Sequence, residues 1–172
     1  MTAAPHHQQL VAFRLGNDQF AADVFSVERV LRYVPPRAIP NVPAWIAGVV
    51  DYQQRVVPVI DLRARFELPP VPPKPETRIL VLHVDGEWIG AIVDAVTEVA
   101  SVEAGAVQPP PPLFRGLSAA FLKGVVRRGD ALIVVLDTAR LLSTTERLVL
   151  EQAGSAPSRE TDLPTAGAPA DA

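Results

Sequence analysis

The sequence contains no cysteine among its 172 residues. Disulfides, thiolate metal sites, iron–sulfur clusters and cysteine nucleophiles are therefore excluded together. No apolar run approaches the ~20 residues needed to span a bilayer, and the longest ones, such as residues 131–136, have the length of a strand. Residues 1–9 have neither the basic region nor the apolar core of a signal peptide. These absences predict a cytoplasmic protein that does not insert into a membrane.

The motifs of common active sites are missing as well. No serine stands in a G-x-S-x-G motif, and no glycine-rich phosphate-binding loop occurs. His6 and His7 lie in a polar terminus, and His83 lies in an apolar segment with no other ligand at metal-site spacing. We expect no catalytic residue, no metal and no cofactor, although Asp61 and Asp137 remain a candidate carboxylate pair.

An excess of charge of either sign is also lacking. The chain has 16 basic and 19 acidic residues, which gives a net charge of −3. A body this close to neutral does not have the basic surface with which proteins bind a phosphate backbone. Nucleic acid is therefore not an expected partner.

Proline, in contrast, is abundant, and its 18 residues are clustered. Four lie between positions 35 and 43, five between 69 and 75, and four at 109–112. Proline can neither donate a hydrogen bond to a sheet nor continue a helix, so the clusters predict connections between short structured segments. This pattern argues against a helical bundle and against a Rossmann-type α/β layout.

Between the proline clusters, the sequence has the pattern of short strands joined by tight turns. Residues 79–84 and 87–93 are apolar segments on either side of Asp85-Gly86, a strong hairpin signal. Residues 125–136 show the same arrangement around Gly129-Asp130. The sequence therefore predicts an all-β, mainly antiparallel fold.

The chain also contains an internal repeat. Gly48-Val49-Val50 is followed after ten residues by Asp61, and Gly124-Val125-Val126 is followed after ten residues by Asp137, an offset of 76 (124 − 48). Upstream, residues 13–30 align with residues 82–99 at an offset of 69 (82 − 13). Two matches in the same order indicate a duplicated unit. We infer two related β-lobes, at about 10–67 and about 78–142.

The ends of the repeats predict helix starts. Asp61 and Asp137 each follow a strand segment and are expected to be N-caps of short helices. Ser143 opens a capping-box pattern that predicts a C-terminal helix over about 144–153. Residues 1–9 are expected to be a flexible N-terminus, residues 10–150 one folded domain, and residues 154–172 a disordered tail.

Four segments in order carry a resemblance to a known family. They are residues 43–49 (P-x-[WF]-[IV]-x-G-V), 57–63 (V-P-[VI]-[VI]-D-L-R), 90–99 (containing V-D-x-V-x-E-V) and 121–125 (Phe-Leu-Lys-Gly-Val). With these motifs, the chain resembles the CheW-like coupling family of bacterial chemotaxis-type signalling over about residues 10–145.

The resemblance implies a fold and a function. The fold would be two five-stranded, SH3-like barrels packed together, and the function would be non-catalytic scaffolding. The implied partners are the cytoplasmic tip of a methyl-accepting receptor and the regulatory domain of a CheA-type histidine kinase. The receptor would use the groove around the first lobe and the lobe junction, and the kinase would contact the exposed ends of the lobes.

The chain departs from the family pattern at two places. Asp51-Tyr52-Gln53-Gln54 stands where the family has N-[LY]-R-G, and Arg29 stands at the glutamate of V-x-E-[IV]. The resemblance implies that the arginine and glutamate of the family contribute to coupling. An ion pair between Arg29 and Asp51 is a hypothesis for what replaces them here.

Four further residues are candidate partner contacts with alternatives open. Val27 and Val30 face either the first-lobe groove or the core. Trp45 either anchors a partner or plugs the lobe, with the plug favoured, and Phe121 lies either at an interface or in the core. Two other functions also stay open. One is a module of the same fold with a different client, in a surface-sensing or twitching pathway. The other is a small β-barrel enzyme.

Overall fold

The computed structural model describes residues 6–110 and 121–141, and this part of the chain is built almost entirely from strands. The strands are β1 (His7–Leu15), β2 (Asp18–Asp23), β3 (Val27–Arg32), β4 (Ile46–Tyr52), β5 (Arg55–Asp61), β6 (Arg78–Val84), β7 (Glu87–Val93), β8 (Ala95–Glu103), β9 (Leu122–Arg128) and β10 (Ala131–Leu136). The helical elements are short: η1 (Val24–Ser26), α1 (Leu62–Arg65), η2 (Ala104–Ala106) and η4 (Thr138–Arg140).

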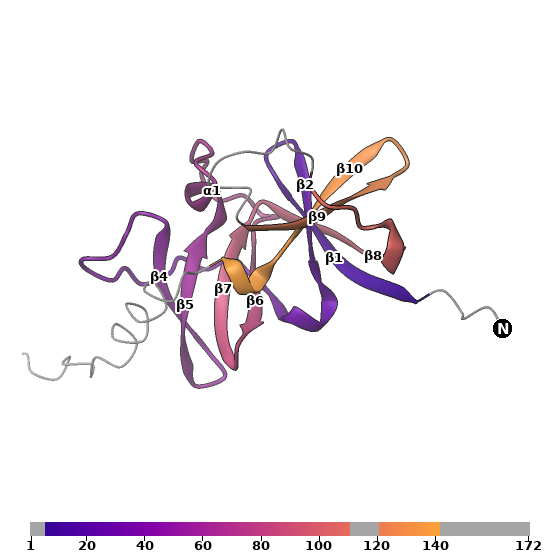
Figure 1. Cartoon of the computed structure of the whole chain (residues 1–172). Helices are drawn as coiled ribbons and strands as arrows, with labels where there is room; N and C mark the ends of the chain where they lie inside the picture. The colour runs from indigo at the N-terminus through magenta and orange to yellow at the C-terminus, as the bar shows by residue number, and fades with distance from the viewer. Residues whose placement is uncertain (1–5, 111–120, 142–172) are drawn as a thin grey trace, which may run out of the picture.

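The ten strands form two five-stranded sheets that lie side by side (Figure 1). Sheet A has the order β8-β1-β2-β10-β9, and sheet B has the order β3-β6-β7-β5-β4. All neighbours are antiparallel except β2 with β10 in sheet A and β5 with β7 in sheet B. The predicted all-β, mainly antiparallel architecture with five strands in each unit is confirmed.

The two repeats do not fold as consecutive lobes, and this corrects the expected division at 10–67 and 78–142. Sheet A joins the hairpin β1–β2 of the first repeat to β8, β9 and β10 of the second. Sheet B joins the hairpin β6–β7 of the second repeat to β3, β4 and β5 of the first. The cause is local. The short η1 connection after β2 carries the chain from sheet A into sheet B, and the residue between β7 and β8 carries it back.

Although each sheet combines strands of both repeats, equivalent positions of the two repeats make equivalent hydrogen bonds. The Asp61 amide donates to the Trp45 carbonyl at 2.8 Å, and the equivalent Asp137 amide donates to the Phe121 carbonyl at 2.8 Å. Gly48 and Gly124 are also equivalent, since a Cβ would lie 2.2 Å from the Arg37 carbonyl oxygen at one and 2.5 Å from that of Gln108 at the other. Both positions therefore need glycine because a neighbouring backbone crosses them.

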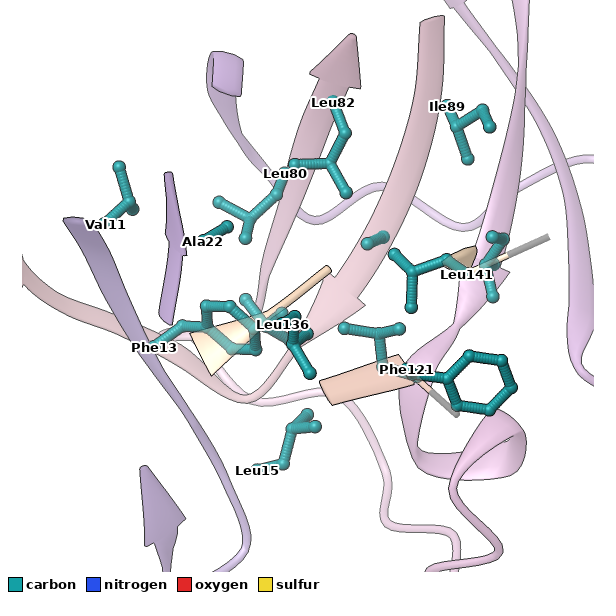
Figure 2. Close-up of a cluster of buried hydrophobic side chains, with 14 of the residues drawn as sticks. Val11, Phe13, Leu15, Ala22, Leu80, Leu82, Ile89, Phe121, Leu136 and Leu141 are labelled. Carbon is teal, nitrogen blue, oxygen red and sulfur yellow. The ribbon is translucent and has the colours of Figure 1, made fainter. Parts of the chain in front are cut away.

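Apolar side chains form three buried clusters. One lies within sheet A and includes Leu10, Val126 and Val135; another lies within sheet B and includes Val50, Val59 and Ile79. The third and largest lies between the sheets, where β1 residues such as Phe13 meet β6 residues such as Leu80 (Figure 2). Many strands are thus covered on both faces, which explains their near-continuous apolar sequences.

The first strand begins closer to the N-terminus than the sequence predicts. Residues 7–9, predicted to be flexible, begin β1 and pair with β8, with His7 opposite Glu103. The Gln8 side-chain amide donates to the Asp23 carboxylate at 2.9 Å, and the Ala104 amide donates to the His6 carbonyl at 2.9 Å. Ladder hydrogen bonds extend a strand through polar residues that no apolar pattern marks. Ser143, the predicted helix at 144–153 and the tail at 154–172 lie outside the described residues.

Candidate functional site

Exposed residues lie on η1 and on both faces of the edge strand β3, and we define the β3 surface as this edge, with Phe25, Arg29 and Val30. β3 is an edge strand, paired only with β6. Phe25 is 92% exposed on η1, and Val30 is 40% exposed. Arg29 is exposed, and the predicted contact residue Val27 is half-buried against the cluster between the sheets. An exposed aromatic side chain at the start of an edge strand is typical of an interaction surface.

The segment 51–54 separates into exposed and buried residues. Asp51, Gln53 and Gln54 are exposed, whereas Tyr52 is 7% exposed, with its ring 5.1 Å from that of Trp88. Tyr52 therefore belongs to the core of sheet B, which corrects its assignment as a partner contact. The strand alternation explains this, because Val50 and Tyr52 lie on the same face. Gln53 and Gln54 form the hairpin turn with φ of 48° and 65°, a left-handed conformation that glycine adopts more easily.

The hypothesised Arg29–Asp51 ion pair does not form. Among the described residues, no Arg29 nitrogen lies within ion-pair distance of a carboxylate. The two side chains come from β3 and β4, which are the opposite edges of sheet B. Sheet A differs, because an ion pair of 3.4 Å between Glu98 on β8 and Arg128 on β9 joins its two edge strands.

Trp45 and Phe121 occupy equivalent positions in the two repeats and meet at the junction of the sheets. The Arg65 guanidinium carbon lies 4.1 Å from the Trp45 ring centroid and 4.7 Å from that of Phe121, in cation–π contact with both. Trp45 is half-buried and packs on the cluster between the sheets, the position expected of a plug. Phe121 is 5% exposed (Figure 2), so its assignment as a partner contact is corrected to a core role.

An ion pair that the sequence did not predict holds the same junction. The Arg63 guanidinium donates two hydrogen bonds to the Asp94 carboxylate, one of them from Nε at 2.8 Å, and a third to the Pro69 carbonyl at 2.8 Å. The Gly16 amide also donates to Asp94, at 2.7 Å. α1, the β7–β8 connection and the β1–β2 turn are thereby tied together.

Each residue of this pair shifts the pKa of the other in the direction that favours its charged form. Hydrogen bonding from Arg63 lowers the pKa of Asp94, and this outweighs the opposing effect of burial; the Gly16 amide lowers it further. Hydrogen bonding to Asp94 in turn raises the pKa of Arg63. Both residues lie within the quoted family motifs, at 57–63 and 90–99, and this position is the signal that could have found them.

A pocket of about 300 Å³ opens between sheet A and the segment that follows α1. Its walls are mainly apolar, with polar groups from the start of β2 at the rim: Asp18, Gln19, Phe20, Phe66, Leu68, Leu122, Leu132 and Val134. Leu132 is 46% exposed, so part of the wall faces outward. No sequence pattern indicates this pocket, because its walls come from four separate segments. A partner's apolar side chain has the size and chemistry to fill it.

The predicted N-caps are observed where they can be checked. The Asp61 carboxylate accepts from the amides of Arg63 at 3.0 Å and Ala64 at 3.4 Å, and Asp137 accepts from Ala139 at 3.2 Å. Both aspartates therefore stabilise helix starts. Within residues 6–110 and 121–141, no three histidine or carboxylate side chains are grouped as metal ligands.

Comparison with known proteins matches this architecture to one family. The family of the CheW-like domain matches residues 9–146. The chain belongs to the CheW-like family. The probable chemotaxis protein CheW of Rhizobium etli is 32% identical over 139 residues, which cover 81% of this chain and 90% of that protein. The chemotaxis protein CheW of Treponema pallidum is 32% identical over 142 residues, covering 80% and 84%.

A solved structure agrees with the sequence comparison. The crystal structure of the scaffolding protein TtCheW from Thermoanaerobacter tengcongensis superposes with a TM-score of 0.76 at 28% identity, over 85% of this CheW-like chain and 94% of TtCheW. Sheets A and B are therefore the two SH3-like barrels of the family. Membership places the chain among the scaffold proteins of chemotaxis-type signal transduction. None of the helices in the described ranges has the length and apolarity required to cross a bilayer.

Proposed function

We propose that this CheW-like chain is a non-catalytic scaffold that couples the cytoplasmic tip of a methyl-accepting receptor to the regulatory domain of a CheA-type histidine kinase. The chain would act in the cytoplasm and be recruited to receptors in the membrane. The observation that carries the proposal is that the described residues include two separate uncovered surfaces. One is the β3 surface at the edge of sheet B, and the other is the pocket between sheet A and the segment after α1.

The positions of the two surfaces suggest which partner each receives. η1 packs against both β1 of sheet A and β6 of sheet B, so Phe25 lies where the two sheets meet. We assign the receptor tip to this junction. The pocket lies between sheet A and the segment after α1, and we assign the kinase domain to it. Two partners on two surfaces can bind together, which is what coupling requires.

The role of charged residues at the junction supports a scaffold over an enzyme. Arg63 and Asp94 are fully engaged in holding three segments together, and Asp61 and Asp137 cap helices. Asp61 and Asp137 are the carboxylate pair that an enzyme would use, and each already has a structural role. These charged residues therefore keep the two surfaces in fixed positions.

The decisive experiment measures binding of the kinase regulatory domain and of a receptor-tip fragment, both encoded in the same genome. Leu132→Glu places a charge on the pocket wall, and Val56→Glu makes the same change at the repeat-equivalent position of sheet B. The two residues are 46% and 52% exposed, so neither change disrupts a core. We expect Leu132→Glu to lose kinase binding and keep receptor binding, and Val56→Glu to keep both. If the unchanged protein binds neither partner, the scaffold function is wrong.

A second function is favoured by the altered residues alone. Arg29 on the β3 surface and the Gln53-Gln54 turn, which lies between β4 and β5, both differ from the family pattern. These changes support a CheW-like module that serves a different client, for example in a surface-sensing or twitching pathway. Binding to a receptor from such a pathway, with no binding to a chemotaxis receptor, would distinguish this function from the first.

A further inference from the structure

The connection between α1 and β6 contains five prolines within residues 69–75, and we call this stretch the proline segment. Each proline fixes its own φ at about −65° and restricts the residue before it to extended conformations. The two other residues, Val71 and Lys74, each precede a proline. The whole segment is therefore confined to the region of a polyproline II helix, which has about three residues per turn and rises about 3.1 Å per residue. In agreement, residues 68–74 belong to no helix or strand.

The proline segment is longer and stiffer than the connection requires. β5 ends and β6 begins at the same end of sheet B, on either side of β7, because Asp61 is opposite Ile92 and Arg78 is opposite Val93. Two strand spacings separate these ends, a distance of about 10 Å. The proline segment alone spans about 20 Å as a polyproline II helix. A shorter and more flexible loop would join the same two strands.

Hydrogen bonds hold the proline segment at both ends and leave its middle open. The Arg63 guanidinium donates to the Pro69 carbonyl at 2.8 Å, and the Arg78 guanidinium donates to the Pro75 carbonyl at 2.7 Å. Between these two anchors, the carbonyls of residues 70–73 accept no hydrogen bond from any residue that the structure describes. A segment that is stiff and fixed at both ends loses little conformational freedom when a partner binds it.

The proline segment presents ridges of different chemistry to solvent. All residues from 69 to 76 are exposed, and Val71 is 44% exposed. In a polyproline II helix, residues three apart lie on one ridge. The segment has three such ridges: Pro69 with Pro72, Val71 with Lys74, and Pro70 with Pro73. The first two together offer proline rings, a branched apolar side chain and a cation, whereas the third offers proline alone.

Lys74 is a positive charge without a counter-charge in the described part of the chain. Its backbone is fixed, because its amide donates to the hydroxyl of the buried Thr77 at 2.8 Å and its carbonyl accepts from the Thr77 amide at 3.0 Å. Its side chain forms no ion pair with a described residue, although Glu76 is exposed two positions away. The ammonium group is therefore available to a carboxylate of another molecule.

We propose that the proline segment is a docking ligand for a protein whose groove is lined by aromatic side chains and ends in a carboxylate. Grooves of this kind bind polyproline II helices with the spacing P-x-x-P, which Pro69 and Pro72 provide. Val71 packs between aromatic rings beside Pro72, and Lys74 pairs with the carboxylate. This interaction goes beyond the proposed function, because the segment is separate from the β3 surface and none of its residues lines the pocket.

The test titrates the full chain with an isolated SH3 domain of the type that binds P-x-x-P-x-[KR] peptides, because its groove has the proposed chemistry. The unchanged chain should bind this probe. Pro72→Ala and Lys74→Glu should each weaken binding about 10-fold or more, since each removes a contact at the centre of the ligand. Pro73→Ala is the matched control: it also removes one exposed proline, but on the third ridge, and should change affinity by less than about 3-fold.

Failure of the inference is distinguishable from failure of the proposed function. No binding of the probe by the unchanged chain, or equal losses for Pro72→Ala and Pro73→Ala, would overturn the inference alone. Pro72→Ala and Lys74→Glu should bind the receptor tip and the kinase domain as the unchanged chain does; a loss there would assign the segment to those partners instead. Sedimentation of the chain without the probe is the last arm, and a dimer that Pro72→Ala abolishes would make a second copy the occupant and overturn the inference.

Discussion

Breaking the Arg63–Asp94 pair should loosen the junction of the two sheets. The two side chains are only 13% and 19% exposed, and Asp94 accepts from both Arg63 and the Gly16 amide. Arg63→Met leaves the mostly buried carboxylate with one donor, so we expect a loss of about 3 kcal/mol in the free energy of unfolding. Asp94→Asn should cost about 2 kcal/mol, and the double variant about 3 kcal/mol. The cycle therefore predicts a coupling energy of about 2 kcal/mol.

The measurement is urea unfolding of the four proteins, followed by circular dichroism. It is repeated as the pH is lowered. Because Arg63 lowers the pKa of Asp94 in the folded protein, the stabilisation by Asp94 is fully present above its unfolded pKa, near 4. It is lost as the pH falls through the folded-state pKa. The difference between the unchanged protein and Asp94→Asn should therefore shrink in acid.

The Glu98–Arg128 pair provides the control. Its side chains are 46% and 42% exposed, so solvent screening should keep its coupling energy below about 1 kcal/mol. Equal coupling for the two pairs would refute the argument that burial and shared donors make the Arg63–Asp94 pair the stronger one. A coupling near zero at neutral pH would refute the role of this pair altogether.

Three smaller changes test other parts of the fold, each by urea unfolding. Gly124→Ala should destabilise by about 1–3 kcal/mol because the new Cβ meets the Gln108 carbonyl oxygen, whereas Gly105→Ala, with no atom within 4 Å, should change little; equal effects would contradict the close-approach argument. Asp61→Ala should cost about 1 kcal/mol by removing the cap of α1, and no loss would mean that the cap is dispensable. Gln54→Gly should stabilise by about 1 kcal/mol because the turn has φ of 65° there; destabilisation would show that the glutamine makes a compensating contact.

The local features of the fold were predictable because they depend on neighbours in sequence. The Asp85-Gly86 turn has φ of 48° and 84°, as its dipeptide predicts. Asp61 and Asp137 cap helices because an aspartate after a strand reaches the first free amides. The repeat was visible because duplicated positions, such as Gly48 and Gly124, serve the same close backbone approach.

The exchange of strands between repeats could not be predicted from the same patterns. β3 and β8 are equivalent, and each could satisfy its ladder in either sheet, because β1 and β6 offer similar apolar partners. The three residues of η1 lead the chain from sheet A into sheet B, and the apolar pattern of the sequence does not indicate this change of sheet. The long-range pair of Arg63 and Asp94, 31 residues apart, depends on this exchange and was missed with it.

The candidate contacts were divided by the same alternation that identified the strands. β4 is buried at every second residue, so Tyr52 turns inward while Asp51 beside it stays exposed. Treating positions 51–54 as one contact segment ignored this alternation. Arg29 and Val30 are exposed because β3 is an edge strand, and their role as partner contacts stays a prediction. Phe25, the most exposed large apolar side chain described, was overlooked. Its repeat-equivalent is Asp94 (25 + 69), so an apolar residue at a polar position was the available signal.

Strand exchange has a direct consequence for a scaffold. Because each sheet combines a hairpin of one repeat with three strands of the other, neither repeat can complete a sheet alone. The largest apolar cluster lies between the sheets, and the Arg63–Asp94 pair closes the same junction, so the sheets are not independent units on a linker. The β3 surface and the pocket are consequently held at a fixed separation and orientation. A binder with two rigidly related surfaces can transmit a displacement of one partner to the other, which a flexible tether would absorb.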